Sequence, residues 1–224
     1  LLRMQSVASK IYRNQGNPEV LKRVPAQASR ILDIGCGAGD NAAQLKGKGA
    51  SIDGLTLSED EAVLAREVCE NVWIHNLEAG LPDAVEGPYD AAICSHVLEH
   101  ICWPEKLLAG VRRVLRPDGR LIVALPNMLT ARNRFRIMLG QWNYTRSGLM
   151  DNTHFRVYTF KTAQEMLRKN GFELVEATAT GALPIPGWGR LPKSIRGGID
   201  GAATWLAPGF IGHQLLYVAK PSVI

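Results

Sequence analysis

Short apolar runs recur along residues 30–180, and segments with helical periodicity lie between them. Apolar runs of this length are typical of strands that are buried on both faces, as in a parallel sheet. Strands that alternate with helices favour an α/β fold with a mostly parallel sheet. The expected strands span residues 30–34, 51–57, 72–75, 91–95 and 121–125, and a final strand spans residues 214–219.

Two helices are marked by their ends as well as by their apolar spacing. Pro104 suits the first helical position, and apolar residues follow at i, i+3 and i+4 spacing as far as Leu115. Thr159 is placed to cap a second helix, which Asn170 and Gly171 would end. We therefore predict one helix over residues 104–115 and another that begins after Thr159.

Length and composition agree with one globular domain. The chain has 224 residues, of which 46% are hydrophobic and 21% charged, and its formal net charge is +5. This charge is small for a protein that wraps nucleic acid, but it would favour an anionic substrate. No apolar run approaches the roughly 18 residues that span a bilayer, and the chain does not open with the apolar segment of a signal peptide. We therefore expect a cytoplasmic protein with no transmembrane segment.

A glycine-rich turn follows the first expected strand, in the segment ILDIGCGAGD. Gly35, Gly37 and Gly39 allow positive φ angles and close approach of a ligand to the backbone, although such a turn could also serve packing alone. The dinucleotide fingerprint G-x-G-x-x-G would need a glycine at Asp40, so the spacing does not fit NAD. Asp33 adds a carboxylate at the mouth of the turn. The turn therefore suits a nucleoside with cationic groups, such as S-adenosylmethionine.

The pattern D-x-G-x-G-x-G after the first strand resembles the first motif of class I S-adenosylmethionine-dependent methyltransferases, and later segments extend the resemblance over residues 30–178. The resemblance implies a Rossmann-like α/β fold, in which helices flank a seven-stranded, mostly parallel sheet whose last strand is antiparallel. It also implies S-adenosylmethionine as the cofactor. The residues of the turn that would bind it are Asp33, Gly35, Cys36, Gly37 and Gly39.

The second strand lacks the acidic residue that usually binds the cofactor ribose in this family. Thr56 stands at that place, and GLTLS resembles the cyclopropane-synthase branch, in which a threonine and a polar residue five positions later share the ribose. Thr56 and Glu61, with Leu57 beside them, are the residues that this resemblance implies. Ser58 and Glu61 could instead form a capping box for the next helix. Asp53 is expected to be solvated, by strand alternation.

Two further segments match the family's adenine side. Asn76 stands where a polar side chain lies near the adenine amino group, with Leu77 packing on the ring. SHVLEHICWP resembles the family's SxVLEHxxxP segment, which implies that Ser95 and His96 line the cofactor pocket. His96, Glu99 and His100 could be read as a metal site. In this setting the glutamate and the second histidine more often anchor the helix and turn, so we expect no metal.

The whole chain, residues 1–224, is expected to form one methyltransferase domain. Residues 1–29 would be an N-terminal helical cover, and residues 30–125 would be the cofactor-binding half. Residues 126–157 would choose the acceptor and form a lid. The glycine- and proline-rich insertion at residues 181–212 could be an apolar wall for a lipid tail, but we favour an irregular crossover.

The segment at residues 126–157 resembles a subgroup of small bacterial methyltransferases with the pattern PN…R…GxxxY…GxxDxTHxRxxT. This subgroup is associated with the modification of cell-surface sugars, lipids or secondary metabolites, and the resemblance names no substrate. An apolar stripe at helical spacing, from Met128 to Leu139, predicts an amphipathic helix that covers the core.

Basic residues gather in the same segment. Arg132, Arg136, Tyr144 and Arg156 are the expected contacts for a small acceptor that is anionic, or linked to a carrier, lipid or sugar. The alternative is a solvated basic face on a packed helix. The interleaved aromatic residues could also suit nucleic acid, which the modest net charge disfavours.

The DNTH segment offers the best candidates for catalysis. Methyl transfer is an in-line displacement at an activated carbon, so the protein mainly holds the reactants in place and a base is optional. For a hydroxyl acceptor, His154 could take the proton while Asp151 orients the ring, and His96 is the second candidate base. Alternatively, Asp151, His154 and Arg156 tie the lid to the core.

These features together favour methyl transfer from S-adenosylmethionine to the oxygen of a small acceptor. One rival function is a non-catalytic, cofactor-binding subunit that regulates a partner enzyme. Another is a nucleic-acid methyltransferase, which strongly salt-dependent binding of RNA or DNA would favour. Assembly of identical chains into an oligomer is compatible with the sequence.

Overall fold

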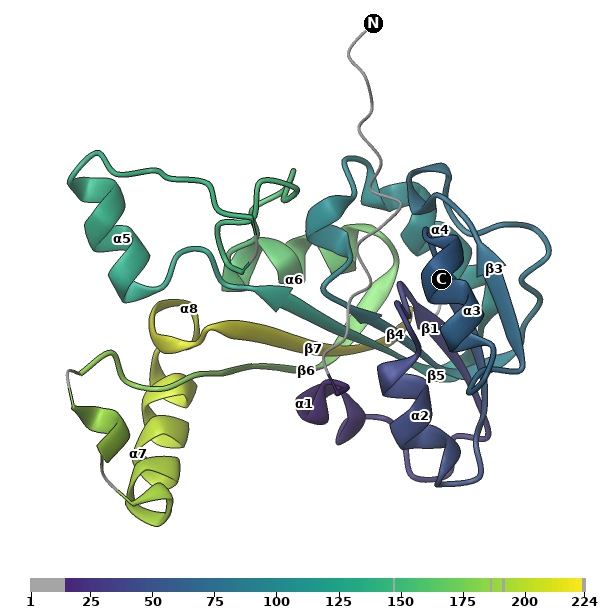
Figure 1. The fold of residues 1–224 in the computed structure, drawn as a ribbon, viewed down its shortest axis with the longest axis horizontal. Coiled ribbons are helices and arrows are strands. Elements are labelled where there is room, and N and C mark those ends of the chain that lie inside the picture. The colour runs from purple at the N-terminus through teal and green to yellow at the C-terminus, as the bar shows by residue number, and fades with distance from the viewer. Residues whose placement is uncertain (1–14, 147, 186, 191, 223–224) are drawn as a thin grey trace, which may run out of the picture.

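A seven-stranded sheet in the order β3-β2-β1-β4-β5-β7-β6 forms the centre of the molecule (Figure 1). The computed structural model describes residues 15–146, 148–185, 187–190 and 192–222. Strands β1 to β5 pair in parallel, and β7 runs antiparallel to both β5 and β6, as expected. The strands are β1 Arg30–Ile34, β2 Ser51–Thr56, β3 Asn71–Ile74, β4 Tyr89–Ser95, β5 Leu115–Pro126, β6 Phe172–Thr180 and β7 Gln214–Pro221.

Helices cover both faces of the sheet. Along β1, Leu32 packs into the core cluster that also holds residues of α4 and α6, whereas Ile31 packs into the cluster with residues of α1, α2 and α3. The α-helices are α1 Pro18–Leu21, α2 Asp40–Lys46, α3 Glu59–Ala65, α4 Pro104–Val114, α5 Ala131–Met138, α6 Phe160–Lys169, α7 Lys193–Leu206 and α8 Pro208–Ile211. Shorter 3₁₀ turns are η2 Leu77–Ala79, η3 Leu98–His100 and η4 Trp188–Arg190.

The elements with strong local signals lie where the sequence places them. Pro104 opens α4, and Thr159 caps α6 through a reciprocal capping box with Thr162. The α6 helix ends before Gly171, whose φ of 79° is strained for residues with a Cβ. The sequence assigns no range to β6, although a seven-stranded sheet requires it.

The prediction that the apolar stripe of 126–157 covers the core is wrong. The stripe forms a helix, α5, but this helix projects away from the sheet (Figure 1), and Met138 is 82% exposed. Arg134 joins α5 to α8: its guanidinium lies 5.7 Å from the centre of the Phe210 ring and donates to the Gly209 carbonyl oxygen at 3.3 Å. Helical spacing in the sequence predicts that the apolar residues share one face of a helix, but it does not predict which element that face contacts.

The insertion at residues 181–212 is also different from the expected irregular crossover. It contains α7 and α8, and α7 packs against α8 and β6. Glycines inside a helix cost about 1 kcal/mol each relative to alanine, so local propensity argues against α7. Tertiary packing overrides that propensity.

The N-terminal stretch at residues 1–29 is described only from residue 15, so most of the expected helical cover lies outside the described residues. Within the described part, α1 packs next to α2, and Val20 is fully buried. In the described ranges, no helix is long and apolar enough to cross a membrane.

Candidate functional site

The carboxyl ends of β1, β2 and β4 meet at one edge of the sheet, because these strands are adjacent and parallel. The glycine turn leaves β1 at this edge, and Gly35, Gly37 and Gly39 have φ angles of 71°, 54° and 84°. A Cβ at Gly35 would lie 2.4 Å from a methyl carbon of Val97. The turn therefore requires glycine for both its backbone angles and its close packing.

Asp33 is the one member of the turn region with an unsatisfied buried charge. Its side chain is 1% exposed, and neither carboxylate oxygen has a hydrogen-bond partner among the described residues. Burial raises the pKa of Asp33 to about 7, although the nearby Asn41 amide, which falls short of hydrogen-bond geometry, partly stabilises the charged form and opposes the shift. A buried carboxylate without a partner fits a ligand that brings a cationic or hydrogen-bond-donating group. S-adenosylmethionine carries an amino group and a sulfonium, so the residues present fit this cofactor.

The thiol of Cys36 faces the core. A Cβ added at Gly54 of β2 would lie 2.8 Å from the Cys36 sulfur and 3.2 Å from that of Cys69. Hydrogen bonding to Cys69 and burial hold the pKa of the Cys36 thiol above its ordinary value. Any contact of Cys36 with a cofactor would therefore come from its backbone.

Thr56 and Glu61 are joined at the end of β2. The Thr56 hydroxyl donates to Glu61 Oε2 at 2.6 Å, and both side chains are buried. Ser58 also caps α3, since its hydroxyl accepts the Glu61 N–H at 3.4 Å. The capping contact and the Thr56–Glu61 pair thus coexist, because the cap uses the backbone of Glu61 and the pair uses its carboxylate. Leu57 is exposed beside them.

The expectation that Asp53 is solvated is wrong. Asp53 is buried, accepts hydrogen bonds from the Tyr89 hydroxyl at 2.7 Å and the Asn71 amide at 2.8 Å, and pairs with Arg30 at 3.4 Å. Strand alternation predicts a solvated side chain only where one face of the sheet meets water. Here helices cover both faces, so both sets of side chains are buried.

Asn76 and Leu77 follow β3, at the same edge of the sheet. The Asn76 side chain is exposed and accepts the Glu78 N–H at 3.0 Å, so it caps η2. Leu77 is buried.

Ser95 and His96 end β4 next to two residues that the sequence does not single out. The Ser95 hydroxyl accepts from Asn17 at 3.2 Å, and His96 Nε2 lies 2.9 Å from Gln214 Oε1. His96 has a φ of 57°, which is uncommon for a residue with a side chain and typical of functional sites. Asn17 and Gln214 are distant in sequence from β4, so no local signal could have found them.

The charge state of His96 depends on Glu99. Burial alone would lower the pKa of His96, but the adjacent Glu99 carboxylate outweighs burial and raises it, with a smaller contribution from Gln214. The His96 Nδ1 lies 3.3 Å from a Glu99 carboxylate oxygen. This pair holds the imidazole at the end of β4.

The DNTH segment lies against η3. The Glu99 carbonyl oxygen accepts the N–H groups of Phe155 and Arg156 at 2.9 and 3.0 Å. The rings of His100 and His154 meet edge to face, with their centres 4.8 Å apart. The structure therefore brings His154 to the segment after β4.

Asp151 supports the turn that carries His154. One Asp151 carboxylate oxygen accepts the N–H and the hydroxyl of Thr153, at 2.9 and 2.7 Å. The His154 Nδ1 instead faces the Leu149 carbonyl oxygen at 3.3 Å. Burial lowers the pKa of His154, which keeps the ring neutral near pH 7.

Comparison with known proteins places this geometry in a family. A family model described as a methyltransferase domain matches residues 9–177. The chain belongs to that family. The cofactor of these methyltransferases is S-adenosylmethionine.

Relatives of this methyltransferase include O-methyltransferases. It is 28% identical over 177 residues to the ubiquinone biosynthesis O-methyltransferase of Thiobacillus denitrificans, with 73% of this chain and 72% of the relative covered. It is 32% identical over 124 residues to the Xylella fastidiosa protein of the same name, covering 50% of this chain and 48% of the relative. The matched region thus spans about half the length of the latter relative.

Solved structures confirm the fold. A SAM-dependent methyltransferase from Archaeoglobus fulgidus superposes with a TM-score of 0.60 at 19% identity, covering 87% of each chain. A second, from Mesorhizobium loti, has a TM-score of 0.61 at 18% identity and covers 91% of this chain and 96% of that chain. At such identities the likeness shows a shared fold.

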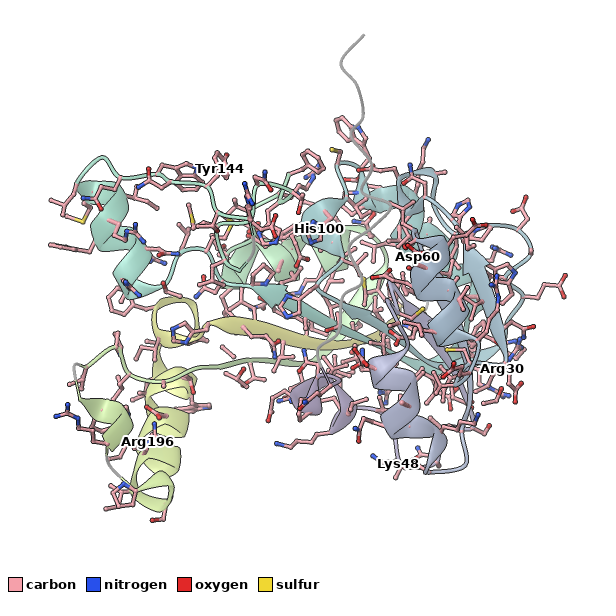
Figure 2. The ribbon with its side chains drawn as sticks, viewed as in Figure 1. Arg30, Lys48, Asp60, His100, Tyr144 and Arg196 are labelled. Carbon is pink, nitrogen blue, oxygen red and sulfur yellow. The ribbon has the colours of Figure 1, made fainter. Side chains whose placement is uncertain are left out.

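The expected acceptor residues of the methyltransferase do not form one cluster. Arg132 and Arg136 lie on α5, and Tyr144 follows on an exposed loop, where it meets Trp142 edge to face. Figure 2 shows Tyr144 well apart from His100.

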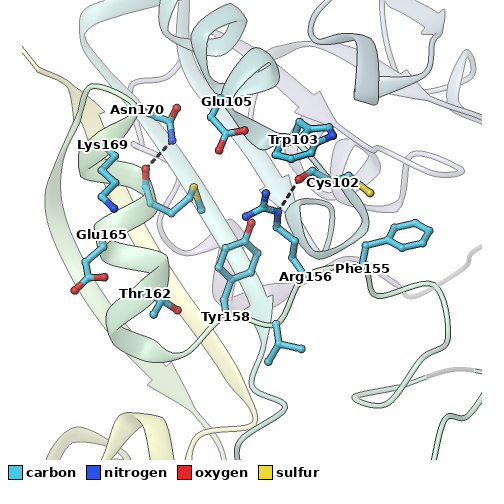
Figure 3. Close-up of a pocket in the computed structure, with 12 residues that line it drawn as sticks. Cys102, Trp103, Glu105, Phe155, Arg156, Tyr158, Thr162, Glu165, Lys169 and Asn170 are labelled. Atoms are coloured by element: carbon cyan, nitrogen blue, oxygen red, sulfur yellow. Dashed lines mark hydrogen bonds between the residues drawn. The ribbon is translucent and has the colours of Figure 1, made fainter.

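Arg156 lies in a separate cavity of about 830 Å³ between the end of η3 and α6 (Figure 3). Its guanidinium donates to the Cys102 carbonyl oxygen at 2.7 Å and lies 5.6 Å from the centre of the Trp103 ring. These contacts tie the backbone at Arg156 to the residues that follow η3, as the structural alternative for Arg156 requires.

Proposed function

We propose that this chain transfers a methyl group from S-adenosylmethionine to a hydroxyl oxygen of a small molecule. The observation that carries the proposal is the unpartnered, buried Asp33 carboxylate at the glycine turn, at the edge of the sheet where β4 delivers His96. The O-methyltransferase relatives favour oxygen as the methylated atom. When bound, S-adenosylmethionine supplies an electrophilic methyl carbon on its sulfonium.

In this proposal, the residues at this edge of the sheet would each contact a different part of the cofactor. Asp33 would accept a hydrogen bond from the cofactor's amino group. The backbone of the glycine turn would lie against the cofactor. The Thr56–Glu61 pair would bind the ribose hydroxyls, since a buried carboxylate can accept from them. Asn76 and Leu77 would meet the adenine, and Ser95 and His96 would close the pocket.

His154 is the proposed proton acceptor for the acceptor hydroxyl. Its lowered pKa leaves the ring neutral, and its Nδ1 is engaged by a backbone carbonyl, so Nε2 carries the lone pair. Asp151 is a positioning residue that acts through Thr153. His96 is the second candidate, although its raised pKa leaves less of the ring in the neutral form that can accept a proton.

The proposed acceptor is anionic, or is linked to a lipid or carrier. Arg132 and Arg136 share α5 with exposed apolar side chains, including Phe135 and Met138. A guanidinium beside an apolar surface suits a molecule that combines an acidic group with a hydrocarbon portion. Arg156 would contribute by holding the lid.

A matched pair of acceptors tests the proposal. The purified chain is incubated with radiolabelled S-adenosylmethionine and either 3,4-dihydroxybenzoate or catechol, which differ by one carboxylate. We expect methyl ethers, formed faster from the acid, and loss of turnover in Gly37→Val. Methylation of added RNA alone would replace this function with nucleic-acid methylation, and cofactor binding without turnover on any hydroxyl would favour a regulatory subunit.

A further inference from the structure

Three potential metal ligands converge beside the proposed acceptor site. Glu99 and His100 belong to η3, and His154 comes from the segment that folds back onto it; His100 is labelled in Figure 2. One ligand atom from each of these residues lies within 4.8 Å of the other two. Ligand atoms around one tetrahedral ion with bonds of about 2.1 Å lie roughly 3.4 Å apart, so these side chains would have to move together by up to about 1.4 Å to bind a single ion.

Glu99 supplies a buried carboxylate whose one described charged contact is His96. The side chain is 1% exposed, and neither oxygen has a hydrogen-bond partner among the described residues. His96 Nδ1 lies 3.3 Å from one of these oxygens, in a geometry that falls short of a hydrogen bond. Burial of a carboxylate in this state is costly unless a cation compensates it.

Each of the two histidines has one ring nitrogen held by a backbone carbonyl oxygen. His100 Nδ1 lies 3.0 Å from the Thr153 carbonyl oxygen, and His154 Nδ1 lies 3.3 Å from the Leu149 carbonyl oxygen. A carbonyl oxygen can only accept, so each Nδ1 carries the proton and each Nε2 keeps its lone pair. This arrangement, with the second nitrogen tied to a carbonyl, is typical of histidines that bind metals.

We propose that Glu99, His100 and His154 bind one divalent transition-metal ion such as Zn²⁺. Two imidazoles and a carboxylate suit Zn²⁺ and its first-row neighbours, whereas Mg²⁺ and Ca²⁺ prefer oxygen ligands. Three protein ligands leave a position open for a further oxygen. The sequence pattern groups His96 with Glu99 and His100 and favours no metal. In the structure His154 joins Glu99 and His100, while His96 lies between Glu99 and Gln214, with Nδ1 3.3 Å from a Glu99 oxygen and Nε2 2.9 Å from Gln214 Oε1.

The inference rests on the proposed function and assigns a role to the ion within it. An acceptor hydroxyl at the open position would lose its proton to water more readily, since a bound cation stabilises the oxyanion. The oxygen electron pair then forms the bond to the methyl carbon while the carbon–sulfur bond breaks. In the metal-bound protein His154 is a ligand, so the proton is taken by water instead of by His154.

Calorimetry on the untagged, metal-stripped chain tests the site with Zn²⁺, and Co²⁺ serves as a spectroscopic probe. We expect one equivalent of Zn²⁺ to bind, ligand-field bands with Co²⁺ and no saturable binding of Mg²⁺. Glu99→Gln and His154→Ala should each weaken Zn²⁺ binding by roughly tenfold or more. S-adenosylmethionine affinity, measured in parallel, shows that each variant is folded.

Two matched histidine variants make the test specific. His213 is exposed and its side chain lies outside the cluster, so His213→Ala should leave Zn²⁺ affinity unchanged. His96→Ala should retain Zn²⁺ binding, whereas its loss would show that the sequence-based grouping with Glu99 and His100 is the correct one. Absence of stoichiometric Zn²⁺ binding, or equal affinity in Glu99→Gln and wild type, overturns the metal site while leaving methyl transfer intact. Failure of methyl transfer with Zn²⁺ bound overturns the proposed function instead.

Discussion

The carboxylate of Asp33 gives a prediction in which stability and cofactor binding change in opposite directions. Burial raises its pKa from 3.8 to about 7 in the folded chain. The unfolded chain therefore loses this proton first as pH rises, and the folded chain binds more protons between about pH 4 and pH 7. The free energy of unfolding must fall as pH rises through that window. At about 1.36 kcal/mol per pKa unit, the loss amounts to roughly 4 kcal/mol by pH 8.

Asp33→Asn removes this titration while keeping the shape of the side chain. The free energy of unfolding of the variant, minus that of the wild type, should rise by roughly 4 kcal/mol between pH 4 and pH 8. Urea denaturation across this range measures the difference, in which the other titrating groups cancel. A new unsatisfied amide would only add an offset that does not depend on pH.

Asp90→Asn is the matched control, because its carboxylate shifts the other way. Burial alone would raise the pKa of Asp90, but the backbone N–H groups of Arg30 and Ser29 donate to it and lower the pKa overall. Its stabilising effect is present above the unfolded pKa and is lost as pH falls, so the control should differ from wild type mainly above pH 4. A difference curve for Asp33→Asn that is flat with pH would refute the reasoning.

Cofactor binding should change the protonation of the same Asp33 carboxylate. A cationic amino group next to Asp33 would lower its pKa, so S-adenosylmethionine binding should release protons at pH 6. Calorimetry in two buffers of different ionisation enthalpy measures this release. Asp33→Asn should bind the cofactor more weakly and release no proton from this site. Unchanged affinity in the variant would show that Asp33 serves the fold alone.

Three further predictions concern the turn, the ribose pair and the base. Gly39→Ala, whose Cβ would lie 2.6 Å from a valine methyl, should destabilise the chain in urea by more than Gly49→Ala, which has a similar φ and open space. The latter isolates the left-handed backbone cost of about 1–2 kcal/mol. Thr56→Val should weaken S-adenosylmethionine binding by about 1–3 kcal/mol, whereas Ser58→Ala should cost about 1 kcal/mol of stability and leave binding unchanged in calorimetry. In the metal-free chain, where His154 can act as the base, His154→Ala should lower kcat by roughly 10²- to 10⁴-fold in the methylation assay with the cofactor Kd unchanged.

The sequence predicts those parts of the fold that depend on near neighbours. The capping of α6 by Thr159 and the stop at Gly171 each rest on contacts within a few residues, so local residue types determine them. The glycine turn is similar, since its φ angles belong to the turn itself. Features of this kind follow from the order of residue types within a single turn of chain.

The wrong predictions share a different origin. The solvated Asp53, the packed α5 stripe and the irregular crossover each required knowledge of which element lies opposite. Asp53 is buried because Tyr89 and Asn71 approach it from neighbouring strands, and α7 is a helix because α8 and β6 contact it. Periodicity describes one element at a time and carries no information about its partner.

The position of His154 also depends on a contact with a distant element, the 3₁₀ turn η3. The backbone contacts that hold the His154 segment on η3 determine how the effects of substitutions there are interpreted. The segment that carries His154 is fixed to η3 by two backbone N–H groups that donate to the Glu99 carbonyl oxygen, and by the Thr153 backbone oxygen beside His100 Nδ1. The two backbone bonds survive replacement of the His154 side chain. A loss of turnover or of metal binding in His154→Ala would therefore reflect the missing imidazole, because the lid would keep its place. His100→Ala removes one of the tethers as well, so it is the less informative variant.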